Sequence, residues 1–281
     1  MTSLFPPTPE PGAPPAYAAP GYAATDGAAY DWFLGRWTVR LAGPFLDFAA
    51  LPADGPVLEV GCGTGSLARA LRERWPDRPI LGVDLSAAYI AHARRQSGTI
   101  QYSVADAQRL CLPDATFAGV LAQLVLNFIP DAPAAVREAK RVVRRGGTVA
   151  AAVWDFRGGL VYQRLFWDTA AGVEASAGTA RDRLFSTPLA SPEGLADLWR
   201  RCGLAEIATG SLTIRMDYET FDDYWRPLLG GQGPVGTYLN SLAPDRQALI
   251  QDRVRAAYLA GGPDGPRSMT ATAWAVRGIK L

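Results

Sequence analysis

The stretch between residues 56 and 154 alternates short apolar runs with segments of helical periodicity. Strands connected through helices pair in parallel, and near-continuous apolar strands are buried on both faces of a sheet. The alternation therefore predicts an α/β fold: a doubly wound, mostly parallel sheet with helices on both sides, in three layers. The apolar runs lie at 56–60, 79–83, 100–105, 117–126 and 148–154, and the helical segments at 66–75, 86–96 and 132–144.

After residue 154 the pattern changes. We expect a helix at 195–202 and strands at 206–218 and 268–277, which brings the number of strands to seven. Two aromatic-rich and partly helical stretches, at about 157–192 and 219–265, separate these elements. We interpret them as insertions between the last elements of a single sheet.

The N-terminal part begins with a proline-rich segment. Seven of the 22 prolines lie within the first 20 residues, and no Lys or Arg precedes Arg36. Such a segment buries too little apolar surface to offset its ordering entropy, and it lacks the basic residues of a secretory signal or transit peptide. We expect residues 1–28 to be a disordered tail on a cytoplasmic protein, ahead of a single domain at 29–281. A tail that folds over the active site is the alternative.

A near-helical pattern of aromatic and aliphatic residues follows the tail. It extends from 31 to 48 and contains Pro44. Because proline lacks the amide hydrogen that an interior helical position donates, Pro44 is a candidate break between two helices.

Charge and cysteine content narrow the classes of function. The 28 Lys and Arg residues nearly balance the 27 Asp and Glu residues, whereas domains that neutralise nucleic-acid phosphates carry a basic excess. We accordingly interpret the five basic residues between 137 and 145 as a solvated helix face. Three scattered cysteines and one histidine, His92, argue against a zinc site. The longest apolar stretch, 119–130, is shorter than the roughly 18 residues that indicate a membrane span. We expect no metal, no nucleic-acid partner and no membrane span.

A glycine-rich loop follows the first apolar run. Gly61, Gly63 and Gly65 have the spacing G-x-G-x-G, and glycine permits positive φ and close approach of a ligand to the backbone. A dinucleotide fingerprint needs G-x-G-x-x-G, whose last glycine would replace Ser66. The loop is therefore not a pyrophosphate cradle of that type. A tight strand-to-helix turn that binds nothing is the alternative.

Two carboxylates stand at the ends of the next strands. Asp84 follows the second apolar run, and Asp106 follows the third. Ligands of such sheets bind at the carboxyl ends of the strands, where Asp84 is suited to accept hydrogen bonds from ribose hydroxyls. Asp106 is suited to an amine donor on an adenine ring. Both residues have an alternative role as helix N-caps.

Together, these motifs resemble the class I S-adenosylmethionine-dependent methyltransferases, in particular the small-molecule branch related to the ubiquinone and menaquinone methyltransferases. The resemblance covers residues 30–156 well and 195–281 in general layout. It implies a seven-stranded sheet with an antiparallel last strand and a cofactor-binding core at 29–156. The matching motifs are Leu58-Glu-Val-Gly-Cys-Gly-Thr-Gly65, Gly82-Val-Asp-Leu-Ser86, Ala105-Asp-Ala107 with Leu112-Pro-Asp-Ala-Thr-Phe117, Leu126-Asn-Phe-Ile-Pro-Asp131 and Arg141-Val-Val-Arg-Arg-Gly-Gly147.

The resemblance also implies a role for each site residue. The three loop glycines would border the methionine and ribose parts of S-adenosylmethionine, and Glu59 would orient the methionine amino group. Asp84 would hold the ribose, with Leu85 against the adenine. The remaining cofactor residues would be Asp106 and the Ala107 amide at the adenine edge, Gln123 and Leu124 beneath the sulfonium, Tyr30 in a covering segment, and Arg36 at the methionine carboxylate. For Arg36 a surface position is the alternative.

The two insertions should cover the methyl group as a lid. An aromatic lining favours an apolar or ring-bearing small molecule, and it also resembles a cage for a cation such as an ammonium acceptor. A plain hydrophobic core is the alternative. No catalytic residue stands out. The candidate substrate residues are Trp154, Tyr162, Phe166, Tyr224 and Trp225.

The expected activity is methyl transfer from S-adenosylmethionine, with S-adenosylhomocysteine as product, to a nucleophilic atom of a small apolar or aromatic metabolite. An RNA, DNA or protein methyltransferase is an alternative, although the Asp/Asn-Pro-Pro-Tyr tetrad of base-amine methylation is absent. A non-catalytic cofactor-binding module and a nicotinamide oxidoreductase are the others. The acceptor atom and the oligomeric state stay open.

Overall fold

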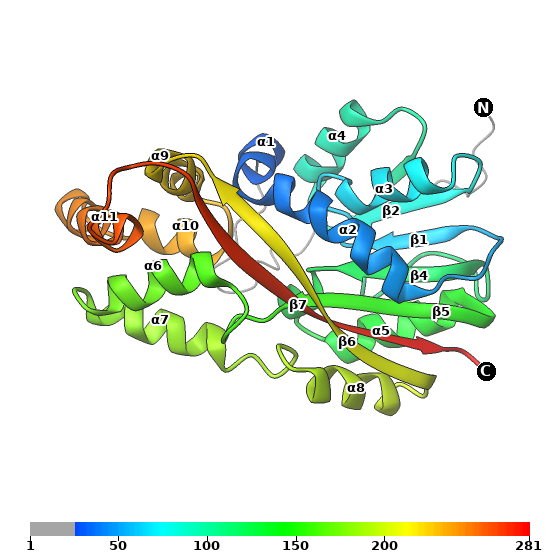
Figure 1. Ribbon diagram of the computed structural model, residues 1–281. Helices are drawn as coiled ribbons and strands as arrows, with labels where there is room; N and C mark the ends of the chain where they lie inside the picture. Colours follow the sequence, from blue (N-terminus) through cyan, green and yellow to red (C-terminus); the bar gives the residue numbers. More distant parts are fainter. Residues whose placement is uncertain (1–25) are drawn as a thin grey trace.

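The computed structural model of the chain describes residues 26–281, and its centre is one seven-stranded sheet (Figure 1). The strand order is β3-β2-β1-β4-β5-β7-β6. All pairs up to β4–β5 are parallel, and β7 runs antiparallel to both of its neighbours. The predicted fold class is confirmed. The strands are β1 (Val57–Val60), β2 (Ile80–Asp84), β3 (Gln101–Val104), β4 (Phe117–Gln123), β5 (Val143–Trp154), β6 (Ala205–Tyr218) and β7 (Arg267–Ile279).

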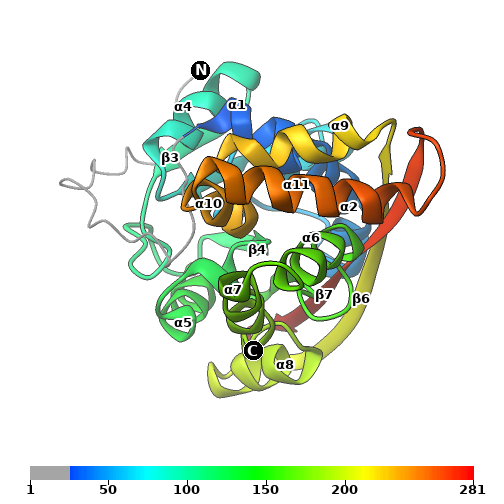
Figure 2. The ribbon, with the colours of Figure 1, turned by 90° about the vertical axis from the view of Figure 1, so that its left-hand side faces the viewer.

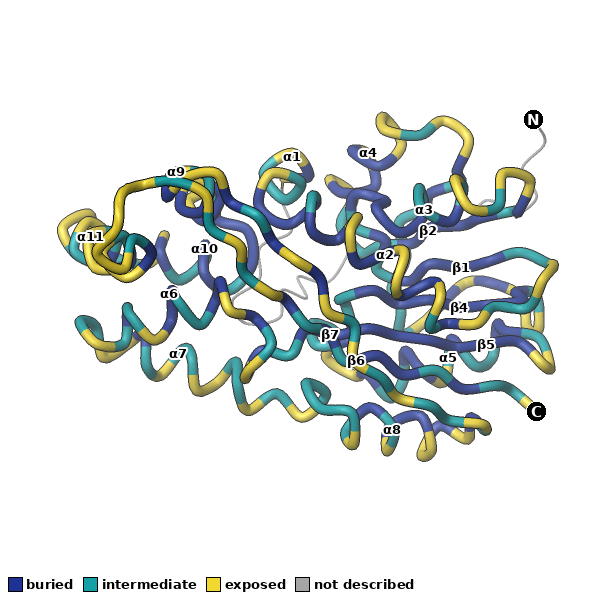
Figure 3. Tube along the Cα trace, in the orientation of Figure 1, coloured by how far each residue is buried: buried dark blue, intermediate teal, exposed yellow. Residues whose placement is uncertain are grey.

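Two apolar cores lie on the two faces of this sheet. Every residue of β1 and of β4 is buried, and successive residues such as Val57 and Leu58 contribute to opposite cores. The burial colouring of Figure 3 shows these central strands as a continuous buried layer. Helices α2 (Arg36–Ala49), α3 (Ser66–Arg74) and α4 (Ala87–Gln96) cover one face, and α5 (Ala132–Val142) and α8 (Pro192–Arg201) cover the other.

The N-terminal segment begins with α1 (Gly27–Tyr30), continues through a π-helical turn η1 (Asp31–Gly35) and runs into α2. Residues 1–25 of the predicted tail lie outside the described residues, and 26–28 belong to the start of α1, which Asp26 caps. The predicted break at Pro44 is wrong, because α2 continues through it to Ala49. Pro44 is itself exposed, and burial of the flanking Leu41 and Phe45 outweighs the lost backbone hydrogen bond.

Six helices of the described part of the chain gather at the carboxyl-terminal edge of the parallel strands (Figures 1 and 2). We call them the cap. Those between β5 and α8 fall within the first predicted insertion, and those between β6 and β7 within the second. Helix α6 packs against α7 and α11, so the two insertions form one body. The cap consists of α6 (Val161–Ala171), α7 (Ala175–Phe185), α9 (Phe221–Trp225), η3 (Arg226–Gly230), α10 (Gly233–Asn240) and α11 (Pro244–Leu259); a single turn, η2 (Leu126–Phe128), follows β4.

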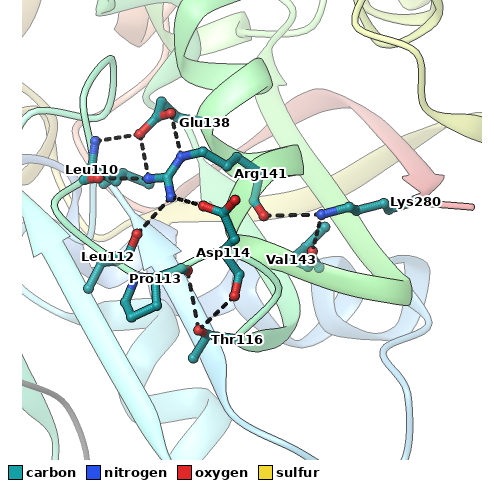
Figure 4. A network of polar contacts seen from close by, with 9 residues as sticks. All are labelled: Leu110, Leu112, Pro113, Asp114, Thr116, Glu138, Arg141, Val143 and Lys280. Atoms are coloured by element: carbon teal, nitrogen blue, oxygen red, sulfur yellow. Dashed lines mark hydrogen bonds and ion pairs between the residues drawn. The ribbon is translucent and has the colours of Figure 1, made fainter.

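The side chain of Arg141 ties the loop after β3 to α5 (Figure 4). Its guanidinium donates to the carbonyl oxygens of Leu110 and Leu112, each at 2.7 Å, and pairs with Glu138 at 2.8 Å. Lys280 in turn donates to the Arg141 carbonyl oxygen. The interpretation of this basic cluster as a solvated helix face is therefore wrong for Arg141.

No helix within residues 26–281 combines the length and the apolar character that crossing a membrane requires.

We predict that Arg141→Met lowers the free energy of unfolding by about 2–3 kcal/mol, because it removes charge-assisted hydrogen bonds to two carbonyl oxygens and to Glu138. Urea unfolding of the two proteins measures the difference. Arg145→Met is the matched control, since Arg145 is exposed on the adjoining segment; it should change stability by less than about 0.5 kcal/mol. Equal urea midpoints for the two variants would contradict the assignment.

Candidate functional site

The loop between β1 and α3 holds three glycines with positive φ: Gly61 at +68°, Gly63 at +53° and Gly65 at +85°. A Cβ on Gly61 would lie 2.4 Å from the Val125 side chain, and one on Gly65 would lie 2.4 Å from the Tyr102 hydroxyl oxygen. Gly63 is different, because its nearest neighbour would be 4.0 Å away. Packing within the protein therefore requires Gly61 and Gly65, and Gly63 is the glycine with free space for a ligand.

Asp84 joins this loop to the end of β2. Its Oδ2 accepts the Gly63 amide N–H at 2.8 Å, and its Oδ1 accepts the Ser86 amide N–H at 2.8 Å. The N-cap of α4 is Ser86, so the alternative of Asp84 as a helix cap is wrong. Burial raises the pKa of Asp84, and backbone hydrogen bonds from Ser86, Gly63 and Leu85 oppose this rise. Each carboxylate oxygen keeps further acceptor capacity.

Asp106 lies in a turn that follows β3. Its Oδ1 accepts the backbone amide of Gln108 at 2.8 Å and the side-chain amide of the same residue at 3.0 Å. No helix begins at this turn, so Asp106 is not an N-cap either. Ala107 lies between Asp106 and Gln108 in the chain. The turn begins one residue after Ala105, whose amide donates to the Asp84 carbonyl oxygen of β2.

Two buried acceptor oxygens lie without partners on adjacent strands. Glu59 on β1 is 2% exposed, and its Oε2 accepts no hydrogen bond within the described chain. Burial raises the pKa of Glu59 well above its usual range. Gln123 ends β4; its Nε2 donates to the Thr38 carbonyl oxygen, and its Oε1 has no partner in the same part of the chain. Leu124 follows with φ of +64°, a strained conformation for a branched residue at a strand end.

The N-terminal segment is fastened onto the glycine loop. Asp31 of η1 accepts the Thr64 hydroxyl through Oδ1 at 2.5 Å, and its Oδ2 lies 2.9 Å from Nε2 of His92 on α4. The Tyr30 ring packs at 5.2 Å from the ring of Tyr89. Asp31 and Thr64 were not among the residues predicted from the sequence. The paired residues come from three separate segments, and no local pattern connects them.

Arg36 connects α2 with the cap. Its Nη1 lies 2.9 Å from Oδ1 of Asp223 on α9, and the guanidinium lies over the rings of Trp37 and Tyr218 at 4.3 and 5.2 Å. Its side chain is 35% exposed. Arg36 is therefore held by three partners and is not a free surface arginine.

The five candidate substrate residues are all buried, at 4% exposure or less, and belong to one apolar cluster. Tyr224 on α9 donates to the Tyr162 carbonyl oxygen at 2.8 Å, and the rings of Phe166 and Trp225 lie 6.2 Å apart. The structure thus brings α6 and α9 together through these side chains. Trp154, at the end of β5, joins the same cluster.

Comparison with known proteins places this site in a family. Residues 58–151 match the family model described as a methyltransferase domain. The 2-methyl-6-phytyl-1,4-hydroquinone methyltransferase of Synechocystis sp. is 27% identical over 65% of this chain and 57% of that protein. Trans-aconitate 2-methyltransferase of Azoarcus sp. is 34% identical over 36% of this chain and 41% of that protein. The region that holds the glycine loop, Asp84 and Asp106 is therefore a methyltransferase domain.

Solved structures share the fold of this methyltransferase domain. A phosphoethanolamine N-methyltransferase 2 of Haemonchus contortus aligns with a TM-score of 0.56 and 16% identity over 90% of this chain and 56% of that one. A protein from Bacillus halodurans described as a methyltransferase aligns with a TM-score of 0.54 and 16% identity over 84% and 97%. The matches to the two sequence relatives cover little more than half of those proteins or less.

The unpartnered atoms of the methyltransferase site fit the chemistry of its cofactor. S-adenosylmethionine carries an ammonium group, a sulfonium and an adenine amine, which are cations or hydrogen-bond donors. Within residues 26–281, the buried atoms without partners include three acceptors around the ends of β1 and β4: Glu59 Oε2, Gln123 Oε1 and Asn127 Oδ1. A buried acceptor is favourable only when a donor reaches it, so these oxygens match the donors of the cofactor.

We predict that Tyr102→Phe offsets much of the damage from Gly65→Ala. The single Gly65→Ala variant should lose about 2–4 kcal/mol of unfolding free energy, since it combines left-handed strain with a clash against the Tyr102 hydroxyl. Tyr102→Phe alone should be neutral or stabilising, because that hydroxyl is buried without a partner among the described residues. Denaturant unfolding of both singles and the double gives the coupling energy.

Gly146→Ala is the matched control for the strain contribution. Gly146 has φ of +71° and open space around its Cα, so alanine should cost only about 1 kcal/mol. Additive effects of Gly65→Ala and Tyr102→Phe on the free energy of unfolding would show that a clash with the Tyr102 hydroxyl does not contribute to the cost of Gly65→Ala.

Proposed function

We propose that this chain transfers the methyl group of S-adenosylmethionine to a nucleophilic atom of a small, apolar or aromatic metabolite. The observation that carries the proposal is the carboxylate of Asp84 bound to the Gly63 amide at the carboxyl ends of β1 and β2, inside a methyltransferase domain. The cap, which contains buried aromatic residues, covers the same edge of the sheet (Figure 1). The geometry, the family and the cap support one reaction class.

The adenosine part of the cofactor is assigned to the ends of β2 and β3. Asp84 would accept the ribose hydroxyls with the lone pairs that its two backbone contacts leave free. Leu85 would pack on the adenine, while Asp106 and the Ala107 amide would bind the adenine edge. The turn at Asp106 holds one carboxylate oxygen by two contacts and so fixes its direction.

The methionine part is assigned to the ends of β1 and β4. Glu59 would orient the amino group, and Gln123 and Leu124 would lie beneath the sulfonium. Their buried oxygens without partners support this placement. Gly63 would border the ligand directly, with Gly61 and Gly65 shaping the loop around it.

The N-terminal segment is the proposed cover of the cofactor. Tyr30 would close over it, and Arg36 would pair with the methionine carboxylate in a charge-assisted contact. In the structure the guanidinium of Arg36 pairs with Asp223, so this role requires it to share or exchange that partner. Tyr30 and Arg36 are parts of one continuous helical run, which supports a joint function.

Methyl transfer is an in-line displacement in which the cofactor, when bound, supplies a methyl group from its sulfonium and leaves as a neutral thioether. The protein therefore needs no acid for the leaving group. Its contribution is alignment of the acceptor and exclusion of water, and alignment can supply up to about 7–11 kcal/mol of the barrier in favourable systems. His92 pairs with Asp31, and the sequence has no other histidine.

The buried aromatic residues of the cap support an apolar or ring-bearing acceptor. Trp154, Tyr162, Phe166, Tyr224 and Trp225 form one cluster at the edge of the sheet where the methyl group would lie. Ring-lined sites bind flat apolar molecules through the large areas they bury.

We predict that S-adenosylhomocysteine binds the purified protein and that Asp84→Asn weakens binding at least about thirtyfold, equivalent to about 2 kcal/mol, by removing a charged acceptor. Titration calorimetry measures both affinities, with circular dichroism to confirm folding. Asp77→Asn is the control, since Asp77 is exposed just before β2, at the opposite end of that strand. Binding of a nicotinamide dinucleotide in place of S-adenosylhomocysteine would refute the cofactor assignment.

Labelled methyl donor tests turnover. Protein incubated with S-[methyl-³H]adenosylmethionine and a small-molecule extract should place the label in low-mass, solvent-extractable products. Label in RNA, DNA or protein fractions would instead favour a macromolecular substrate. Cofactor binding without any transfer would favour a non-catalytic module.

A further inference from the structure

The carboxylate of Asp31 bridges two segments that border the proposed cofactor site. Its Oδ1 accepts the hydroxyl hydrogen of Thr64 at 2.5 Å, and Thr64 belongs to the loop that follows β1. Its Oδ2 lies 2.9 Å from Nε2 of His92 on α4, the helix that follows β2. Asp31 itself belongs to the N-terminal segment, at the first position of the π-helical turn η1. One side chain thus joins three separate parts of the chain.

The contact with Asp31 holds the glycine loop at a point where the loop has little conformational preference of its own. Thr64 is 1% exposed and stands between two glycines of positive φ. Glycine has the most conformational freedom to lose, so contacts from outside must fix such a loop. The Gly63 amide donates to Asp84, and the Thr64 carbonyl oxygen accepts from Nη1 of Arg69 at 2.7 Å. The hydroxyl contact with Asp31 adds to these two anchors, and the N-terminal segment supplies it.

The helical run leaves space for this carboxylate at Gly35. Gly35 is buried, lies four residues after Asp31 and has φ of −55°, an ordinary helical value that does not require glycine. A Cβ there would lie 2.8 Å from Oδ1 of Asp31, closer than a non-bonded contact permits. Glycine inside a helix is less favourable than alanine. Its presence at this position therefore preserves the place of the Asp31 carboxylate.

We infer that Asp31 is a positioning residue for cofactor binding, because it holds Thr64, and with it the adjoining Gly63, in the arrangement that the cofactor meets. The inference deepens the proposed function and rests on its assignment of S-adenosylmethionine to the glycine loop. Asp31 acts through the Thr64 hydroxyl and does not itself contact the cofactor. The coupling is reciprocal: a ligand that requires this arrangement of the loop also stabilises the N-terminal segment against it.

Substitutions of Thr64 test the hydroxyl directly. Thr64→Val removes it and keeps the shape of the side chain, so binding of S-adenosylhomocysteine should weaken at least about fivefold, as one lost hydrogen bond implies. Thr64→Ser keeps a hydroxyl and should bind within about twofold of wild type. Asp31→Ala should weaken binding about as much as Thr64→Val, but by less than about twofold when Thr64→Val is already present. Titration calorimetry measures these affinities, and circular dichroism confirms folding.

Gly35→Ala tests the same contact while Asp31 and Thr64 stay unchanged. The added methyl group should displace the Asp31 carboxylate and weaken S-adenosylhomocysteine binding at least about threefold, although alanine favours the helix. Gly178→Ala is the matched control, since Gly178 lies inside α7 and a Cβ there would have its nearest neighbour at 3.8 Å. That variant should keep the wild-type affinity and raise the thermal midpoint by about 1–3 °C.

Hydrogen exchange of the wild-type protein gives a measurement that needs no variant. Saturating S-adenosylhomocysteine should slow amide exchange in peptides that cover residues 27–35, as mass spectrometry detects. Unchanged exchange with the ligand bound, equal affinities of Thr64→Val and wild type, or additive effects of Asp31→Ala and Thr64→Val would each overturn the inference. No binding to the wild-type protein would refute the proposed function itself, whereas binding that is insensitive to these substitutions refutes only the role of Asp31.

Discussion

The hydrogen bond from the Gly63 amide to Asp84 is the contact on which the site depends. The sheet order reverses direction between β1 and β4, so the crevice at the carboxyl ends of these strands is the place where a ligand can enter. A chain that turns there leaves amide groups without partners unless a side chain accepts them. Asp84 accepts two, and by doing so it fixes the left-handed turn at Gly63 and the start of α4 together.

The N-terminal helical run links that loop to the cap. Asp31 binds Thr64 of the loop, and five residues later Arg36 binds Asp223 of the cap. Because both contacts are made by one run of η1 and α2, movement of this run would change the glycine loop and α9 at the same time. The partly exposed Arg36–Asp223 pair adds little stability, as is usual for such pairs. Its significance is positional: it couples the proposed cover of the cofactor to the helix that carries Trp225.

Much of the architecture could be predicted from local sequence patterns. The features that could not be predicted depend on contacts between residues far apart in the chain. The strands were predictable because β4 is buried along its whole length and leaves a continuous apolar run. The helix break predicted at Pro44 was wrong because burial of Leu41 and Phe45 by distant segments outweighs the local tendency of proline to end a helix. Arg141 looked solvated because its carbonyl partners at Leu110 and Leu112 belong to a loop about 30 residues earlier. The partner of Arg36 lies 187 residues away, beyond any periodicity.

The site contains buried polar atoms whose role apolar patterning does not reveal. The pattern of aromatic residues in the cap is equally typical of a hydrophobic core, of a cage for a cation and of the lining of a substrate site. Single buried atoms add information that this pattern lacks: within residues 26–281, the oxygens Glu59 Oε2 and Gln123 Oε1 on the sheet have no hydrogen-bond partner. These acceptors support the proposed place of the methionine ammonium group at the ends of β1 and β4, which the aromatic pattern alone does not indicate.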